Sequence, residues 1–143
     1  MHRLDDIFDF SFDLLALLCS AKPHKLVWSL NEKLHLNFIR ETDIALNFKE
    51  QQEQHYIYYI HQTDYATIHL MRNKSHVNKG NPISYLLPEL SQYDYFFLID
   101  DPSKAYQFER IKSQLKELPI VEHQLLVNAA TLKNKDNLMF YYG

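Results

Sequence analysis

The stretch of sequence that decides the fold runs from Ser84 to Asp101 and reads Ser-Tyr-Leu-Leu-Pro-Glu-Leu-Ser-Gln-Tyr-Asp-Tyr-Phe-Phe-Leu-Ile-Asp-Asp. Its second half alternates as a β-strand does, because successive strand side chains point to opposite faces. One face would carry Tyr93, Tyr95, Phe97 and Ile99, and the other would carry Asp94, Phe96, Leu98 and Asp100. Apolar side chains leave both faces in the middle of this segment. The pattern therefore predicts a central strand that is covered on each side.

The first half of the same stretch predicts a single helical turn over residues 87–90. Pro88 would occupy the first helical position, where its fixed φ fits and its missing N–H costs nothing. Glu89 would lie in the first turn, where a carboxylate can face unpaired backbone amides. The turn would lead directly into the central strand.

These residues also carry a resemblance to a known family. The run Leu87-Pro88-Glu89, followed after three residues by Tyr93-Asp94-Tyr95, resembles the signature of the IPExxxVDY family of small bacterial proteins. Leu87 stands where the signature has Ile, and Tyr93 where it has Val, so both positions keep an apolar or aromatic side chain. Residues 8–19, 25–36 and 132–140 are also similar, and the resemblance covers the whole chain. It implies a cytoplasmic protein and brings no established activity with it.

The composition fits one folded domain over residues 1–143, which is long enough to bury a sizeable core. Apolar residues make up 46% of the chain and aromatic residues 14%, which argues against disorder. The 15 lysines and arginines are outnumbered by 18 acidic residues. A net charge of −3 gives no electrostatic reason to expect nucleic acid or an anionic membrane as a partner.

The signals for a compartment point to the cytoplasm. A single cysteine, Cys19, excludes an intrachain disulfide and suits a reducing environment. The first residues are acidic where a signal peptide would be basic. The longest unbroken apolar run, residues 14–19, is far shorter than the roughly 20 residues that span a bilayer. We therefore expect a soluble protein that does not enter a membrane.

Periodicity along the chain predicts an α+β fold. Residues 8–19 alternate as a strand, with a helix from Ser11 as the rival, and Leu26, Leu30 and Leu34 predict a helix over residues 23–36. Residues 38–49 fit a strand-loop-strand or one irregular strand, and residues 55–61 and 65–71 an antiparallel hairpin. A helical stripe ends at Pro119, and strands are expected at residues 121–127 and 138–142. The sum is a mainly antiparallel sheet of five to seven strands with two main helices packed on one face.

Several kinds of site are excluded or disfavoured by the sequence. Gly80 and Gly143 are the only glycines, so neither a P-loop nor a Rossmann fingerprint exists and no cofactor is predicted. The chain has eight histidines, of which His55, His61 and His69 could converge on a transition metal across the hairpin. Their spacing matches no known ligand motif, and strand histidines are more often packing residues. We therefore predict no metal site.

Glu89 and Asp94 are the acidic pair of the motif and allow two interpretations. They could act as general acid and base, with Tyr85, Tyr93 or Tyr95 in support. Alternatively, Glu89 caps its turn while Asp94 accepts hydrogen bonds from loop amides or a tyrosine hydroxyl. The structural interpretation is favoured, so the sequence leans against an enzyme.

The chain contains ten tyrosines and nine phenylalanines, which could stack on bases as on an RNA-binding sheet. The RNP pattern is missing, however, and the net charge has the wrong sign for RNA. If both helices cover one face of the sheet, the opposite face needs another cover, and exposed apolar surface usually marks an interface. We therefore expect a non-catalytic interaction or regulatory protein, most simply a two-fold homodimer. Its binding residues would be Tyr56, Tyr58, Tyr93 and Tyr95. The alternative is a small enzyme or ligand-binding protein that uses Glu89 and Asp94 with nearby tyrosines or histidines. RNA binding is a minor alternative.

Overall fold

The computed structural model describes residues 12–47, 53–76, 82–104 and 108–142. In this part of the chain, strands and helices follow one another in an irregular order that includes three 3₁₀ segments. The elements are β1 (Asp13–Leu18), α2 (Pro23–Leu34), β2 (Ile39–Arg40), β3 (Ile44–Leu46), β4 (Gln54–Tyr56), β5 (Tyr58–Gln62), β6 (Thr67–Arg72), η1 (Pro88–Leu90), β7 (Tyr95–Asp100), α3 (Phe108–Lys116), β8 (His123–Val127), η2 (Ala129–Thr131) and η3 (Lys135–Tyr142).

The main sheet has six strands in the order β2-β5-β6-β7-β1-β8, and all neighbours are antiparallel. A separate ribbon of two antiparallel strands is formed by β3 and β4. β7 lies between β6 and β1, so the prediction of a central strand is confirmed. The predicted α+β class, with a mainly antiparallel sheet, is confirmed as well.

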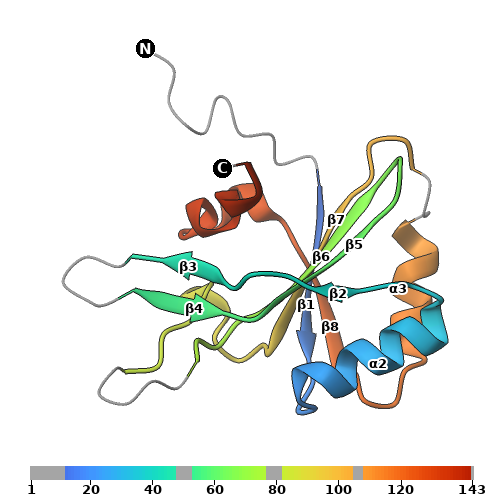
Figure 1. The fold of residues 1–143 in the computed structure, drawn as a ribbon, viewed down its shortest axis with the longest axis horizontal. Coiled ribbons are helices and arrows are strands. Elements are labelled where there is room, and N and C mark those ends of the chain that lie inside the picture. The colour runs from blue at the N-terminus through green and yellow to red at the C-terminus, as the bar shows by residue number, and fades with distance from the viewer. Residues whose placement is uncertain (1–11, 48–52, 77–81, 105–107, 143) are drawn as a thin grey trace.

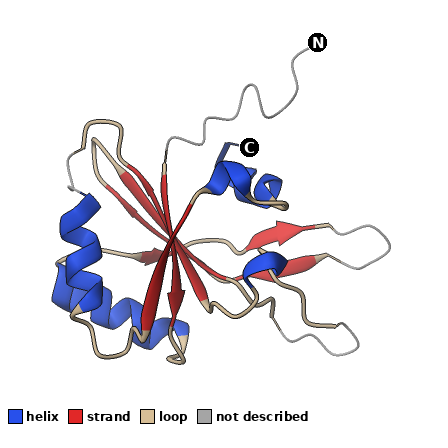
Figure 2. Ribbon diagram, turned by 180° about the vertical axis from the view of Figure 1, so that it is seen from behind, coloured by secondary structure: helices blue, strands red, loops and turns tan. Residues whose placement is uncertain are grey.

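Both long helices lie against the same face of the sheet, as Figures 1 and 2 show. The amphipathic pattern explains α2, because its buried residues Leu26, Leu30 and Leu34 recur every fourth position. Pro23 occupies the start of α2, and His35 ends it in the left-handed conformation with φ of 55°. In the described ranges, no helix combines the length and the apolar character that a bilayer crossing requires.

The core between the helices and the sheet uses one set of alternating strand residues. β7 contributes Tyr95, Phe97 and Ile99 to this core, and β1 contributes Leu15 and Leu17. The helices add their buried stripes, including Ile111 and Leu115 of α3. Burying a large aliphatic or aromatic side chain stabilises the fold by about 1.5–3 kcal/mol, so this face contributes a large part of the stability.

The opposite face of the sheet carries a second core, and the same chain covers it. The cover consists of the β3–β4 ribbon, the segment that enters η1, and the C-terminal η2 and η3, which lie on the far side of the sheet from the helices (Figure 1). The buried residues of this core are Phe12, Leu14, Ala16, Ile44, Tyr56, Met71, Leu86, Leu87, Phe96, Leu98, Ala129 and Leu138.

The expectation that this face lacks a cover is therefore wrong. The sequence pattern predicts one strand over residues 55–61. In the structure Ile57 separates two strands, and the first of them, β4, pairs with β3 outside the main sheet. The sequence pattern also predicts that residues 138–142 close the sheet, whereas they belong to the 3₁₀ segment η3. β4 and η3 lie over the sheet face, whereas β5 stays in the main sheet. The β5–β6 hairpin itself is confirmed.

One fully buried side chain, Asn73, joins the sheet to this second cover. Its backbone N–H donates to the Asp94 carbonyl at 2.9 Å, and its carbonyl accepts from the Leu86 N–H at 2.7 Å. Its side-chain amide donates to the carbonyls of Leu90 and Tyr93, both at 2.9 Å. Its Oδ1 accepts a hydrogen bond of 2.9 Å from the Leu87 backbone N–H. Asn73 thus fixes the turn of η1 against the end of β6.

Replacing Asn73 should destabilise the protein strongly. Asn73→Ala leaves one buried N–H and two part-buried carbonyls without their hydrogen-bond partner, and each such loss costs about 1–3 kcal/mol when the group is buried. We expect the free energy of unfolding to fall by about 3–5 kcal/mol, measured by urea denaturation. The exposed Asn47 provides the control, because Asn47→Ala should change the stability by less than about 0.5 kcal/mol. Equal effects of the two substitutions would contradict the role assigned to Asn73.

Candidate functional site

Glu89 holds the C-terminal segment. Its two carboxylate oxygens accept hydrogen bonds from the Asn134 backbone N–H at 2.7 Å and the Asn134 side-chain amide at 3.0 Å. Burial would raise the pKa of Glu89, but the hydrogen bonds from Asn134 bring that pKa below its ordinary value. A carboxylate held in its ionised form is a poor general acid.

Asp94 holds a different part of the fold. Its Oδ2 accepts a hydrogen bond of 2.8 Å from the Cys19 backbone N–H, which follows β1. Its own N–H donates to the Leu17 carbonyl at 2.9 Å. Asp94 and Glu89 are therefore anchored to separate segments of the chain. Asp94 accepts from a backbone amide, as the structural interpretation of the sequence expected, whereas Glu89, expected to cap its own turn, binds Asn134 of the C-terminal segment.

The four tyrosines proposed for binding do not form one surface. Tyr95 is buried in the core beneath the helices, and its hydroxyl donates to the Ala21 carbonyl at 2.7 Å. Tyr56 is buried in the second core, and burial raises the pKa of its hydroxyl to about 12. Tyr58 and Tyr93 are half-buried and pack against that same second core. An exposed aromatic binding face built from these residues is thus contradicted by their burial.

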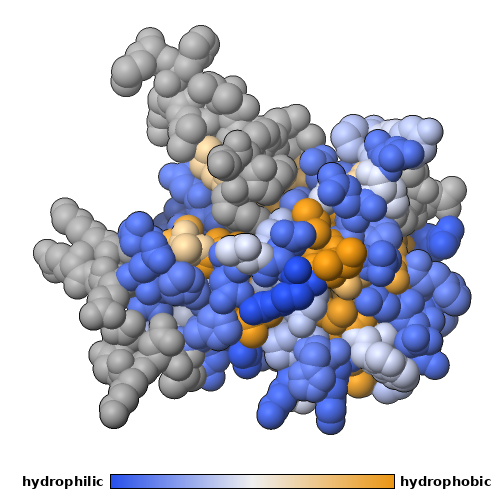
Figure 3. Space-filling view, viewed as in Figure 1, coloured by the Kyte–Doolittle hydropathy of each residue, from blue (hydrophilic) through white to orange (hydrophobic). Residues whose placement is uncertain are grey.

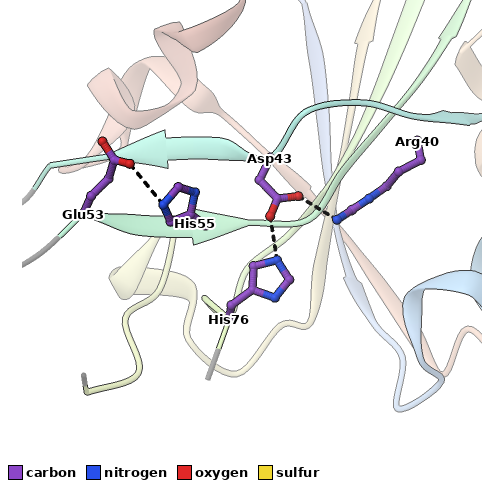
Figure 4. Close-up of polar contacts among 5 residues, drawn as sticks. All are labelled: Arg40, Asp43, Glu53, His55 and His76. Carbon is purple, nitrogen blue, oxygen red and sulfur yellow. Dashed lines mark hydrogen bonds and ion pairs between the residues drawn. The ribbon is translucent and has the colours of Figure 1, made fainter. Parts of the chain in front are cut away.

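The histidines proposed as metal ligands are also kept apart. Across the hairpin, His61 lies opposite Ile68, which belongs to the helix-side core, whereas His69 belongs to the other face. Because neighbouring residues on a strand alternate, the two rings leave opposite faces of the sheet. His55 lies on the ribbon and contacts Glu53 at 3.0 Å (Figure 4). No group of three candidate ligands occurs among the residues that the structure describes.

Two groups that the sequence proposed for different sites do meet. The Tyr58 hydroxyl and His69 Nδ1 share a hydrogen bond of 2.5 Å, and the two rings stack at 5.8 Å with an angle of 4°. Burial lowers the pKa of His69 to about 4, and burial also raises the pKa of Tyr58 well above its usual range. Both groups therefore stay neutral near pH 7, and the pair is a packed polar contact between β5 and β6.

The exposed polar contacts around the ribbon are ordinary surface interactions. Asp43 binds Arg40 through one oxygen and His76 Nε2 through the other, both at 2.7 Å (Figure 4). The contact with His76 fastens the segment between β2 and β3 to the loop that follows β6. Exposed ion pairs of this kind contribute about 0–1 kcal/mol each.

The two edges of the sheet differ in how they are protected. β2 is two residues long, and its Arg40 guanidinium lies 5.6 Å from the Tyr59 ring. A short, charged edge strand resists pairing with another chain. Figure 3 shows a compact apolar area near β2 on a face that is otherwise largely hydrophilic. Ile39 of β2 is 56% exposed, and the charged Arg40 follows it directly in the same strand.

The other edge strand, β8, has no such protection. Its five residues are His-Gln-Leu-Leu-Val and include neither a lysine, an arginine, an acid nor a proline. Leu125 and Leu126 are 37% and 55% exposed, and the alternation of the strand places one on each face. Among the described strands, only β1 pairs with β8. An exposed apolar edge of this kind is a template for a further strand.

A cavity of about 400 Å³ lies beside this edge, between α3 and β8. Gln124 spans its side, because its Nε2 donates to the Lys112 carbonyl of α3 at 2.8 Å. We call this hollow the β8 cavity. Its lining includes Leu15, Lys112, Lys116, Glu122, Gln124 and Leu126. It combines an apolar floor with two ammonium groups and one carboxylate.

Comparisons with known proteins add no assignment to these features. A scan against protein-family models finds no match, and neither does a search of curated proteins or of solved structures. Because a fold by itself does not specify an activity, the function is argued from the edge and the cavity.

Sequence reasoning expected a strand at residues 121–127 but named no binding residue in it. Two signals were present. Lys112 and Lys116 are four residues apart, which puts both on one face of the predicted helix. The predicted strand also lacked the charges that usually protect an edge. What the sequence could not show is that this strand ends the sheet, since strand order depends on distant pairing.

The buried His69 should make stability depend on pH. In the unfolded chain its pKa is about 6.5 and in the folded chain about 4, so the unfolded state binds more protons between these values. The stabilisation is complete above about pH 6.5 and is lost as the pH falls toward 4. We expect His69→Gln to remove up to about 3 kcal/mol of this decline, measured by urea unfolding across the range. His24→Gln, at an exposed histidine, is the control, and identical pH slopes for both variants would refute the assignment.

Proposed function

We propose that this chain is a non-catalytic interaction protein that pairs through the outer edge of β8 with a second copy of itself. The observation that carries the proposal is an exposed, uncharged strand at the end of a six-stranded sheet. Two such edges meeting antiparallel would join both sheets into one and satisfy the outward backbone groups of each β8.

The sequence of β8 suits a two-fold axis. Leu125 is the middle residue of the strand, so full-length antiparallel pairing places it opposite the Leu125 of the second copy. The same register sets Gln124 opposite Leu126 and His123 opposite Val127. No like charges meet in this arrangement, and the two exposed leucines become buried. Such pairing is isologous and therefore closes at two copies.

Support for an interaction role also comes from what the motif residues do. Glu89 and Asp94 bind backbone amides of this chain, which leaves the surface edge as the feature that the fold itself does not use. A protein that shares the IPExxxVDY signature through these positions would share their role in folding. We accordingly propose membership of that family and a cytoplasmic location as parts of the same hypothesis.

The dimer is tested by placing a charge at the proposed two-fold axis. Leu125→Lys sets two ammonium groups opposite each other, and like charges directly across a strand pair are destabilising. We expect sedimentation velocity to show a dimer for the natural sequence. For Leu125→Lys the dissociation constant of the dimer should be at least about tenfold higher. Ile39→Lys is the matched control, because it charges an exposed aliphatic residue of the opposite edge. A natural sequence that stays monomeric at every concentration would overturn the proposal.

Cross-linking gives an independent test of the register. Cys19 is the only cysteine, it is 1% exposed, and burial raises the pKa of its thiol, so the background reaction should be slow. Residues on the axis of an antiparallel pair have Cβ atoms about 4.5–5.5 Å apart, which is close to disulfide geometry. Leu125→Cys should therefore oxidise to a covalent dimer faster than Ile39→Cys. Equal rates at the two edges would contradict pairing through β8.

A further inference from the structure

The β8 cavity is amphipathic, and its two kinds of surface come from different elements. Leu15 of β1 is fully buried and forms an apolar floor, which Leu126 of β8 extends toward the surface. Lys112 and Lys116 stand on α3 at the other side. Gln124 ties the two sides together through its hydrogen bond to the Lys112 carbonyl. At about 400 Å³ the cavity is within the size range of small-molecule sites in proteins.

The charges of the lining favour an anion. Lys112 Nζ lies 3.5 Å from Glu109, but that glutamate side chain is 80% exposed, and such surface pairs are weak. The Lys112 ammonium also lies 5.6 Å from the centroid of the Phe108 ring. Lys116 makes no ion pair with a carboxylate of the described residues. The Lys116 charge therefore remains available to a ligand, and the Lys112 charge is engaged only by the weak surface pair with Glu109.

The remaining polar groups limit the anion to a single charge. Among the lining side chains, the ammonium groups of Lys112 and Lys116 and the Glu122 carboxylate leave a net charge of +1; Glu109, which pairs with Lys112, is not part of the lining. A dianion such as phosphate would be repelled by Glu122 and would leave the apolar floor unused. His123 also borders the cavity, but its ring stacks on Tyr93 at 6.3 Å.

We infer that the β8 cavity binds an organic monocarboxylate with a short apolar chain. The carboxylate is held by Lys112 and Lys116, and the chain lies on Leu15 and Leu126. Apolar contact contributes about 0.8 kcal/mol for each methylene group that is buried, so affinity rises with chain length until the floor is filled. This inference goes beyond the proposed dimer and does not depend on it.

The test measures binding of four probes to the intact chain by chemical-shift changes of its backbone amides. Hexanoate carries both required features, hexanamide lacks the charge, acetate lacks the chain, and inorganic phosphate carries excess charge. Hexanoate should bind at least about tenfold more tightly than each of the other three, with the shifts centred on α3 and β8. Equal binding of hexanoate and hexanamide would overturn the inference.

The location is tested by matched substitutions. Lys112→Gln combined with Lys116→Gln should weaken hexanoate binding by about tenfold or more, whereas Lys33→Gln on the exposed end of α2 should leave it unchanged. Glu122→Gln should reduce the difference in binding affinity between hexanoate and phosphate, because it removes the carboxylate that repels the dianion. A second hollow beside Trp28 and Lys25 is the competing site. Shifts confined to the Trp28 indole, or no effect of the double substitution in a variant with normal melting, would place the ligand elsewhere and refute the inference.

Loss of the dimer and loss of the ligand are distinguishable. Leu125 pairs with Ala16, which belongs to the second core, so its side chain lies on the face away from the β8 cavity. Leu125→Lys should therefore disrupt the dimer and keep the affinity for hexanoate. Lys112→Gln combined with Lys116→Gln should keep the dimer and weaken the binding of hexanoate.

Discussion

β7 buries apolar side chains on both of its faces, and this constraint obliges the chain to build two covering layers. The helices form one layer, with each of α2 and α3 contributing a buried stripe. The other layer is assembled from the β3–β4 ribbon, η1 and the C-terminal 3₁₀ segments, which are far apart in the sequence (Figure 2). Polar contacts hold these pieces in place, among them Asn73 with η1 and Asn137 Nδ2 with the Leu86 carbonyl at 2.8 Å. Without that second layer, half of the core would face water.

The features that follow from local periodicity could be predicted from the sequence. The alternation correctly separated the two faces of β7 from Tyr95 onward, because strand geometry fixes that separation whatever the partners are. Tyr93, expected on the same face as Tyr95, precedes the strand and packs against the second core. The i, i+4 leucines of α2 predicted its buried stripe, and the proline of η1 marked the first position of its turn. The resemblance to the family signature falls on the turn of η1, whose Glu89 binds the C-terminal segment, and on Asp94, which binds the Cys19 N–H after β1. In each case neighbouring residues carry the information.

The features that depend on distant contacts could not be predicted in this way. The segment from Gln54 to Gln62 is rich in strand formers throughout, and nothing in its pattern shows that β4 leaves the main sheet at Ile57. Residues 138–142 also have strand propensity, but they belong to the 3₁₀ segment η3, whose Leu138 is buried in the second core. The candidate site depends on strand order, which makes β8 an edge and brings α3 beside it. Correct assignment of β8 as a strand therefore did not identify its exposed edge.

With both faces covered by its own chain, the sheet leaves its rim as the place where we propose that a second copy binds. Hydrogen–deuterium exchange at low and high protein concentration tests this most directly, because pairing protects only the amides that meet the second copy. We predict that higher concentration slows exchange in residues 123–127 and leaves unchanged the rates in β5 and in the second cover. Slowing confined to the ribbon and the C-terminal segments, with β8 unaffected, would contradict the account and return the interface to the face of the sheet.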